Sequence, residues 1–597
     1  MAAGLALQAD KIFYALGPIG RYQILHLLLV SLGVFPALIQ LLDNVFIGAA
    51  VQQRCAQPPE NSSTAQYGGL ASLIASSSSS SSSNVSVTFE KCHIKVNDTA
   101  QSLVEEHSCL YGFEYEGPRT QSVISQLDLV CDKEQLLRLT QTLVFAGQGL
   151  GAIIGPFFSD RFGRKPTMVS ANLGMLALGM TIAFAPNYIV FAICKFLVGA
   201  LQQSLYIPIC IYTGEMLPTE YRRYSIIVNT IAWSIAGLSM SVVAFFMRDM
   251  SWRYLQAVLS LSSLAFIVQL CAMDESIVWL IANGRKSEAI KCIKRAARWN
   301  KKDFEEVLKS GCTDDIAEIE VTIEDTLISV ENTLTSSALE ENKSLNSGLK
   351  EQEEDDNVTR SEADTTIETG KISFIQVLRV RRFFINAVAM WVTWLSASLG
   401  YFTLYLMVST LAGDKYLNYV LTSLMDIPAC FIFFFGFNKY GRRSVTILLY
   451  SILAAGTFTL GLLRHFTDSE SETWSVITLI MSLISIVGGS GCFFSIFFYL
   501  PELFPTNVRN QATGYASCFA RIGAMISPFM AALANIAIWA PGLIMGAFAS
   551  VAVFLLFLLP ETKNKQLPHT IADMESWYKK DSSSSDEDSN DNTKAII

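Results

Sequence analysis

Charged residues are scarce in this 597-residue chain, and its histidines are few and scattered. Asp, Glu, Lys and Arg make up 16% of the residues and hydrophobic residues 51%, whereas soluble domains carry roughly 25% charge. The five histidines lack metal-ligand spacing, and the sequence shows no nucleophile and base pair and no phosphate-binding loop. No basic stretch suggests nucleic acid as a partner. Composition therefore excludes an ordinary soluble domain and argues against an enzyme.

What the chain has instead is twelve apolar runs, each long enough to cross about 30 Å of hydrocarbon. They lie at 23–48, 138–158, 167–185, 188–211, 225–247, 253–273, 384–409, 416–437, 445–464, 474–499, 511–537 and 540–559. Uninterrupted runs of this length favour helices over barrel strands. We predict an all-α membrane protein of twelve transmembrane helices in two six-helix halves.

The basic residues between these runs predict the orientation. Arg161, Arg222, Arg382 and Arg442 fall in loops on one face, which the positive-inside rule makes cytoplasmic. The first residues lack the features of a removable signal peptide. We therefore expect a multi-pass plasma-membrane protein with both termini in the cytoplasm. Its parts are an N-terminus (1–22), an N-terminal half (23–275), a central loop (276–383), a C-terminal half (384–560) and an acidic tail (561–597).

A long polar loop, 50–135, separates the first two runs and falls on the outer face. Disulfides and N-linked glycans are possible there. Four cysteines allow three pairings, among which the sequence does not choose. The cysteines are Cys55, Cys92, Cys109 and Cys131, and the glycosylation sequons are at Asn61, Asn84 and Asn97.

Short charged motifs occur twice at a nearly constant offset. Residues 160–165 (DRFGRK) recur at 438–443 (NKYGRR), an offset of 438 − 160 = 278. Residues 215–222 recur at 502–509, an offset of 287, and Glu275 recurs at Glu561, an offset of 286. Such repetition predicts two related halves that move against each other. The residues assigned to gating are Asp160, Arg161, Gly163, Arg164, Lys165, Glu215, Arg222, Gly441, Arg442, Glu502 and Arg509.

Two ionisable residues lie deep within the predicted helices, where charge is costly and usually functional. Arg521 follows Gln511 by ten residues and Asp426 follows Tyr416 by ten, so each lies roughly 15 Å deep, near the bilayer midplane. They could bind opposite ends of a zwitterion, or Arg521 could hold an organic carboxylate. Alternatively, they neutralise each other as a structural pair.

Aromatic and polar residues complete the predicted substrate site. Trp394 and Tyr401 lie seven residues apart and share a helix face, and a ring face suits an ammonium group. Packing is the alternative role for both. Gln148 and Asn229 are further polar groups within the spans.

Several motifs resemble those of solute carrier family 22, the organic cation, anion and zwitterion transporters of the major facilitator superfamily. They are Gln126 to Cys131, Ser159 to Lys165, Asp274-Glu275-Ser276, Pro501 to Asn510 and Pro560 to Lys563. The chain departs from the family at Ile277-Val278, where Pro-Arg is usual.

The resemblance also implies a substrate class. Cation-transporting relatives carry an acid where Arg521 stands, and anion transporters often carry a lysine where this chain has Cys430. Arginine without that lysine is most similar to the carnitine-type branch. Glu502 matches a position that those relatives tie to sodium-coupled uptake, so sodium coupling is possible. No other cofactor is expected.

We therefore expect a secondary active or facilitative carrier of zwitterions such as carnitine, or of organic cations, that works by alternating access. The alternative substrate is an organic carboxylate. An alternative of another class is a membrane sensor that keeps the carrier fold without transport. The expected partners are the small organic ion and the lipid bilayer, and the oligomeric state stays open.

Overall fold

The computed structural model describes residues 2–49, 51–57, 85–98, 103–109, 111–311, 379–411, 413–466, 471–504 and 506–563. Within these ranges, twelve helices are long and apolar enough to cross a membrane, which confirms the predicted number of spans. Uninterrupted spanning helices are α7 (Glu134–Phe162), α8 (Arg164–Ala183), α9 (Tyr188–Glu215), α10 (Tyr224–Phe246), α18 (Arg381–Leu406), α21 (Arg442–Phe466), α22 (Glu472–Tyr499), α23 (Thr506–Leu533) and α24 (Ala540–Phe557).

Three spans are interrupted rather than continuous. The first comprises α2 (Arg21–Ser31), α3 (Val34–Leu42) and α4 (Asn44–Ile47), the sixth α11 (Trp252–Ser260) and α12 (Ala265–Ala272), and the eighth α19 (Lys415–Leu424) and α20 (Asp426–Tyr440). Breaks within the membrane are tolerated where the freed backbone groups are buried in protein. Two of these breaks place an acid at the bend, Asp43 and Asp426.

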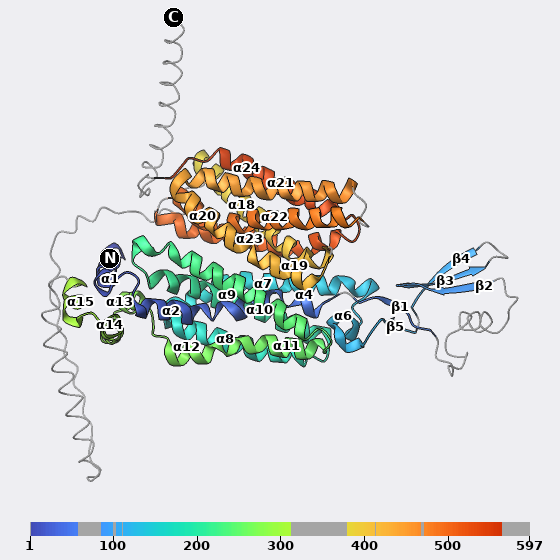
Figure 1. Ribbon diagram of the computed structural model, residues 1–597, viewed down its shortest axis with the longest axis horizontal. Helices are drawn as coiled ribbons and strands as arrows, with labels where there is room; N and C mark the ends of the chain where they lie inside the picture. The colour runs from blue at the N-terminus through green and yellow to red at the C-terminus, as the bar shows by residue number, and fades with distance from the viewer. Residues whose placement is uncertain are drawn as a thin grey trace, which may run out of the picture.

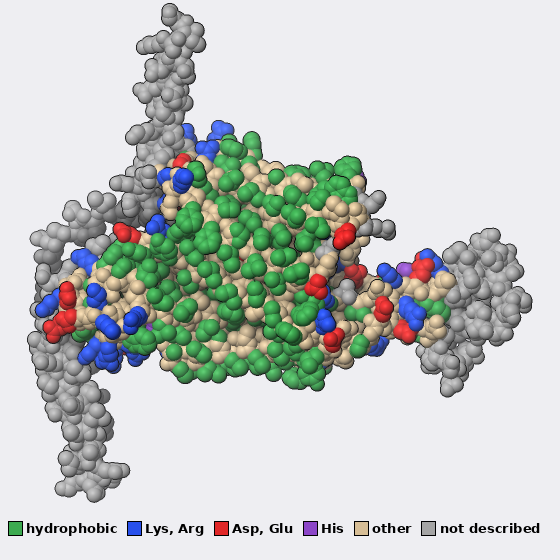
Figure 2. Space-filling model, in the orientation of Figure 1, with side chains coloured by type: hydrophobic (Ala, Val, Ile, Leu, Met, Phe, Trp, Pro, Cys, Tyr) green, Lys and Arg blue, Asp and Glu red, His purple; other side chains and the backbone are tan. Residues whose placement is uncertain are grey.

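The helices form two bundles that lie side by side, one from each half of the chain (Figure 1). The halves meet along two seams, α7 against α23 and α10 against α19 and α20. Hydrophobic side chains cover the middle of the visible face across both bundles, while charged side chains gather at its two ends (Figure 2). This distribution is the one that a bilayer-spanning protein requires.

One end of the molecule carries helices outside the spans. These are α1 (Ala2–Leu16), α13 (Ile277–Ala282), α14 (Lys286–Asn300) and α15 (Phe304–Gly311), which pack together (Figure 1). Asn300 ties them to the first span: its Nδ2 donates to the Leu16 carbonyl and to Gln23 Oε1, and its Oδ1 accepts from Tyr22 N at 2.9 Å. We call this the α14 end.

The opposite end, called the sheet end, carries short strands that an all-α prediction does not include. Strands β1 (Gln53–Cys55) and β5 (Phe113–Tyr115) pair antiparallel, and β2 (Val85–Phe89), β3 (His93–Asp98) and β4 (Leu103–Ser108) form a second antiparallel sheet. Asn97 lies on β3, whereas Asn61 and Asn84 lie outside the described residues.

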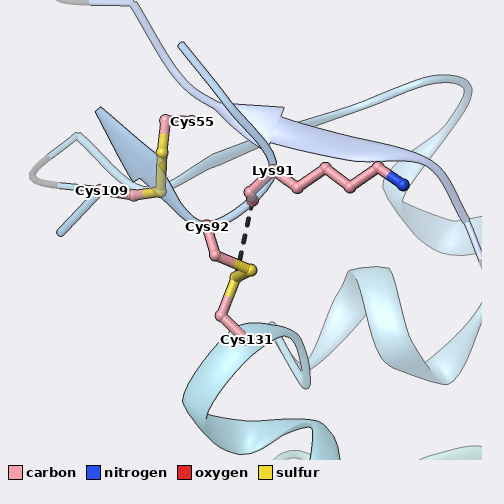
Figure 3. Close-up of a disulfide and its surroundings, with 5 residues drawn as sticks. All are labelled: Cys55, Lys91, Cys92, Cys109 and Cys131. Carbon is pink, nitrogen blue, oxygen red and sulfur yellow. Dashed lines mark hydrogen bonds between the residues drawn. A yellow bond between two sulfur atoms is a disulfide. The ribbon is translucent and has the colours of Figure 1, made fainter. Parts of the chain in front are cut away.

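Two disulfides select one of the three possible cysteine pairings (Figure 3). Cys55 is joined to Cys109, and Cys92 to Cys131. Cys131 lies directly before α7, so the second bridge fastens the sheet to the start of a spanning helix. The cross-links restrict a polar segment that has little apolar core of its own.

We expect the double variant Cys92→Ser/Cys131→Ser to loosen the sheet without unfolding the bundle. The loss of one native bridge costs about 2–5 kcal/mol, and this bridge joins the sheet to α7. Limited proteolysis of the full chain should then cut within residues 85–131 at least tenfold faster. Cys271→Ser, which removes an exposed free cysteine, serves as the control. Unchanged cleavage in the double variant would contradict this role of the bridge.

Candidate substrate site and charged helix-end motifs

Arg521 on α23 points across the seam toward the other half. Its Nη1 donates to Gln148 Oε1 on α7 at 2.8 Å, and Gln148 Nε2 in turn donates to Gln202 Oε1 at 2.7 Å. The Arg521 side chain is partly buried, and its Nε is buried without a hydrogen-bond partner. Since Gln148 is 2% exposed, the guanidinium faces protein and not lipid.

Asp426, the first residue of α20, is 1% exposed and surrounded by aromatic hydroxyls. Its Oδ2 accepts from Tyr405 Oη at 2.9 Å and from Tyr401 Oη at 3.2 Å. Its Oδ1 is buried and accepts no hydrogen bond among the described residues, although the Ser490 side chain lies close enough to interact with the carboxylate. One carboxylate oxygen thus keeps its accepting capacity for a ligand.

Trp233 connects this acid to the other half of the chain. Its Nε1 on α10 donates to Tyr401 Oη at 3.2 Å, and its ring packs edge-on against Tyr206, with centroids 5.4 Å apart. Tyr401 therefore links Asp426 to aromatic rings of the N-terminal half. Such a setting suits an organic cation, which a carboxylate attracts by charge and ring faces attract by cation–π interaction.

The two buried charges do not neutralise each other in this structure. Among the described residues, no ion pair joins Arg521 to Asp426 or to any other carboxylate. Arg521 has a neutral amide as its partner and Asp426 has neutral phenols. Because an uncompensated buried charge is expensive, this geometry supports a role in binding charged groups.

The other predicted binding residues have different surroundings. Trp394 is 2% exposed and packs against Phe497, while Tyr401 packs against Phe493. The face of α18 that they share therefore packs against α22. For Trp394 this favours the packing role. Asn229 donates to Thr213 Oγ1 at 3.0 Å within its own half.

Tyr405 and Trp233 were not among the predicted site residues. Tyr405 lies one helical turn after Tyr401, a spacing that could have indicated it. Nothing in the sequence relates Trp233 to Asp426, since they lie in different halves.

The repeated motifs form similar ion-pair networks in the two halves, both at the α14 end of the molecule. In the first half, Arg164 pairs with Asp160 at 2.6 Å and with Glu215 at 3.1 Å. In the second, Arg442 pairs with Glu502. Asn438 stands where the first half has Asp160, and its Nδ2 donates to the Phe434 carbonyl. The second copy thus lacks one ion pair, because an amide stands in place of the carboxylate.

Two glutamates complete these networks by capping helix starts. Glu275 accepts from the backbone N–H groups of Arg164 and Lys165, and Glu561 accepts from those of Arg442 and Arg443. A carboxylate at a helix N-terminus accepts hydrogen bonds from the free N–H groups and interacts favourably with the positive end of the helix dipole. Burial raises the pKa of Glu275, although these N–H bonds act in the opposite direction.

The remaining gating candidates have separate positions. Arg161 is exposed over the Phe162 ring, and Arg222 lies 3.5 Å from Asp10 on α1. The backbone of Arg509 lies in α23, but its side chain is outside the described residues. Within the described part of the chain, each of these ion pairs joins two residues of the same half, and none of them connects the two halves.

The turn before α8 gives a direct test of this network. Gly163 has φ = +112°, and a Cβ there would lie 2.2 Å from Glu275 Oε2. We expect Gly163→Ala to destabilise the protein by about 1–3 kcal/mol through backbone strain and a displaced cap, measured as a lower melting temperature. The matched control is Gly214→Ala, where a Cβ would meet nothing within 4 Å. Equal melting temperatures for the two variants would contradict the role of this turn.

A further buried ion pair lies on the first and fourth spans. Lys195 Nζ is 2.5 Å from Asp43 Oδ1, and the two side chains are 0% and 1% exposed. The buried pair gives Lys195 a structural partner within its own half. Asp43 itself was not predicted, because helical spacing does not indicate contacts between helices.

Two repeated bundles of spanning helices, with buried charges where the halves meet, define a membrane carrier. The family profile described as Major Facilitator Superfamily matches residues 133–528 and 417–579. The chain belongs to the major facilitator superfamily, and it is a transporter and not an enzyme.

Its relatives extend across solute carrier family 22. The chain is 28% identical to "Organic cation transporter-like protein" of Drosophila melanogaster over 96% of this chain and 93% of the relative. It is 26% identical to "Solute carrier family 22 member 16" of Bos taurus, covering 94% and 92%, and 27% identical to "Organic anion transporter 3" of Mus musculus, covering 95% of each. Among solved structures, the proton:xylose symporter XylE gives a TM-score of 0.53 at 15% identity, over 92% of this chain and 99% of that one.

Proposed function

We propose that this protein carries small organic ions across the plasma membrane by alternating access, with zwitterions such as carnitine or organic cations as substrates. Arg521 would bind the carboxylate of a zwitterion and Asp426 its ammonium group, with Tyr401, Trp233 and Gln148 lining the path between the halves. The names of the relatives, which include organic cation and organic anion transporters, support organic ions as the substrate class.

The observation that carries this proposal is the separation of the two buried charges. Among the described residues each has neutral partners only, and each contacts a residue of the N-terminal half directly or through one tyrosine. A substrate held between them would therefore touch both halves. Its binding energy could then favour the arrangement in which the halves close around it.

The proposed orientation places the sheet end outside the cell and the α14 end in the cytoplasm. Disulfides at the sheet end fit an oxidising compartment, and basic loops at the α14 end fit the positive-inside rule. Asn61, Asn84 and Asn97 are then candidate glycosylation sites. Glu502 is the residue that would couple transport to sodium, and its carboxylate pairs with Arg442.

Organic carboxylates are the second candidate substrate, and one observation favours them. Arg521 is a partly buried guanidinium with no carboxylate in ion-pair range among the described residues, so it suits an anion that brings its own charge. Asp426 would then serve only to hold Tyr401 and Tyr405.

Uptake into cells that express the chain discriminates among these substrates. Labelled carnitine, a tetraalkylammonium and an aromatic carboxylate are compared in wild type and in Arg521→Ala. Uptake of carnitine that falls in Arg521→Ala supports the zwitterion proposal. Uptake of the cation alone, unchanged in Arg521→Ala, refutes the role of this residue, and binding without flux of any of the three favours the sensor alternative.

A further inference from the structure

A cavity of about 370 Å³ lies at the sheet end, away from the two buried charges. Its walls come from the N-terminal half (α4, α10 and α11), from the start of α19 in the C-terminal half, and from the base of the strands. Neither Arg521 nor Asp426 lines it. The lining residues used below are Phe46, Met247, Arg248, Trp252, Lys415 and Tyr416. The volume suits a ligand of one or two rings.

The apolar part of the lining is largely aromatic. Phe46 and Tyr416 stack with centroids 5.5 Å apart and planes 7° from parallel. Met247 and the buried Trp252 add further apolar surface. Aromatic faces and methionine together form the kind of wall that binds aromatic ligands.

The lining carries two cations, Arg248 and Lys415, and two acids, Glu116 and Asp249. Lys415 is partly buried, and its ammonium lies 5.1 Å from the Tyr416 ring centroid. The neighbouring Asp414 attracts it, but no carboxylate among the described residues lies within ion-pair distance. Arg248 pairs with Asp249 at 3.6 Å, but both are well exposed, so that pair is weak. Glu116 on the strand side is exposed. Lys415 is thus the cation best placed to bind an incoming acid.

The cavity also depends on how the halves sit against each other. Ser241 Oγ on α10 donates to the Tyr416 carbonyl on α19 at 2.8 Å, across the seam. If the sheet ends of the halves moved apart, the wall that carries Lys415 and Tyr416 would leave the rest of the lining. A ligand that needs both walls binds the closed sheet end more tightly and therefore stabilises it.

Ring contacts connect this cavity to the acid of the proposed substrate site. Phe46 packs edge-on against Tyr419 with centroids 5.1 Å apart, and Tyr419 packs against Tyr405, which donates to Asp426. Movement of the lining residues would therefore be transmitted to Asp426 through this chain of packed rings.

We propose that this sheet-end cavity binds a small aromatic organic anion, such as an aryl carboxylate or sulfonate, at a site separate from the transport site. Lys415 binds the acid, the Phe46 and Tyr416 rings and Met247 bind the aromatic body, and occupancy holds the sheet ends of the two halves together.

Calorimetric titration of the full chain in lipid nanodiscs with naphthalene sulfonate tests the site without requiring transport. We expect one saturable component whose affinity falls about tenfold in Lys415→Gln, because a charge-assisted contact is lost, and which Lys415→Arg largely retains. Lys133→Gln, an exposed lysine at the same end, is the matched control and should bind like wild type. Melting temperatures confirm that the variants are folded.

The variant Arg521→Gln shows whether the sulfonate binds in the transport site or in the sheet-end cavity. If the sulfonate occupies the sheet-end cavity, Arg521→Gln binds it like wild type. Binding that is lost in Arg521→Gln but kept in Lys415→Gln would place the ligand at the transport site and overturn the proposal. Absence of saturable binding, or equal affinity in wild type and Lys415→Gln, would overturn it as well.

The effect on closure has its own readout once a transported substrate is known. The sulfonate, added on the side of the sheet end, should lower the maximal uptake rate without raising the KM, since it traps one state and does not compete. A raised KM with an unchanged maximal rate would contradict the stabilisation of the closed state. Failure of the proposed substrates leaves the binding experiment unaffected, so the two proposals are tested separately.

Discussion

Arg521→Ala should reduce uptake of a carboxylate-bearing substrate such as carnitine by about a hundredfold. A substrate carboxylate buried without its cation loses roughly 3 kcal/mol, which corresponds to this factor. The structure supports so large an effect because the Arg521 guanidinium has no ion-pair partner among the described residues. Its Nη1 donates to the amide of Gln148, and its Nε has no hydrogen-bond partner there. Initial rates of labelled carnitine uptake, normalised to the amount of protein at the cell surface, measure it.

The control for this prediction keeps the charge and changes the geometry. Arg521→Lys retains a cation but loses the two-pronged donor geometry that guanidinium offers to a carboxylate, so we expect intermediate uptake. Uptake of a tetraalkylammonium should be little affected in either variant, because that cation has no carboxylate. Carnitine uptake at the wild-type rate in Arg521→Ala would show that the guanidinium does not bind substrate.

Asp426→Asn should have a comparably large effect on cationic substrates. The side chain is 1% exposed and has one oxygen without a hydrogen-bond partner among the described residues. Removal of its charge leaves a bound ammonium group with ring faces alone, which contribute about 2 kcal/mol in a desolvated site. We expect tetraalkylammonium uptake to fall at least thirtyfold, measured as initial rates at equal surface expression.

Tyr405→Phe is the matched variant for the acid. It removes the 2.9 Å hydrogen bond to Asp426 Oδ2 but leaves the charge, the ring and the Tyr401 hydrogen bond. We expect a reduction of only a few-fold, near the worth of one hydrogen bond to a charged group. If Tyr405→Phe were as damaging as Asp426→Asn, the carboxylate would serve to order the tyrosines and not to bind substrate.

Much of the fold could be predicted from sequence because bilayer thickness fixes the length of each apolar run. The span predicted at 138–158 lies within α7, which begins at Glu134 and ends at Phe162. The helix extends past the apolar run on both sides, where polar and charged residues continue it. The strands between 53 and 115 could not be inferred, because short polar strands next to a serine run give little periodic signal.

The candidate site could be predicted only in part. Depth along a helix follows from the rise per residue, so Arg521 and Asp426 were found as buried charges. The partners of each charge depend on which faces of distant helices meet. Trp233, in the other half, is linked to Asp426 through Tyr401. Asp43, at a break in the first span, pairs with Lys195 on the fourth span. Periodicity within one helix carries no information about such contacts.

The glutamate caps show an intermediate case. Glu275 and Glu561 occur at nearly the same offset as the other repeats, so the sequence indicates that they are equivalent. Their role depends on the turns at Gly163 and Gly441, whose φ angles of +112° and +99° bring each helix start against a carboxylate. The repetition is visible in sequence, whereas the capping geometry is not.

The most direct test of the central claim is a double-mutant cycle of carnitine binding, measured by calorimetry on the purified full chain. The four proteins are wild type, Arg521→Ala, Asp426→Asn and the variant with both changes. If the two charges bind opposite ends of one molecule between the halves, each single change weakens binding, and the double change is less damaging than the sum of both. Carnitine affinity that stays at the wild-type value in either single variant would contradict the account.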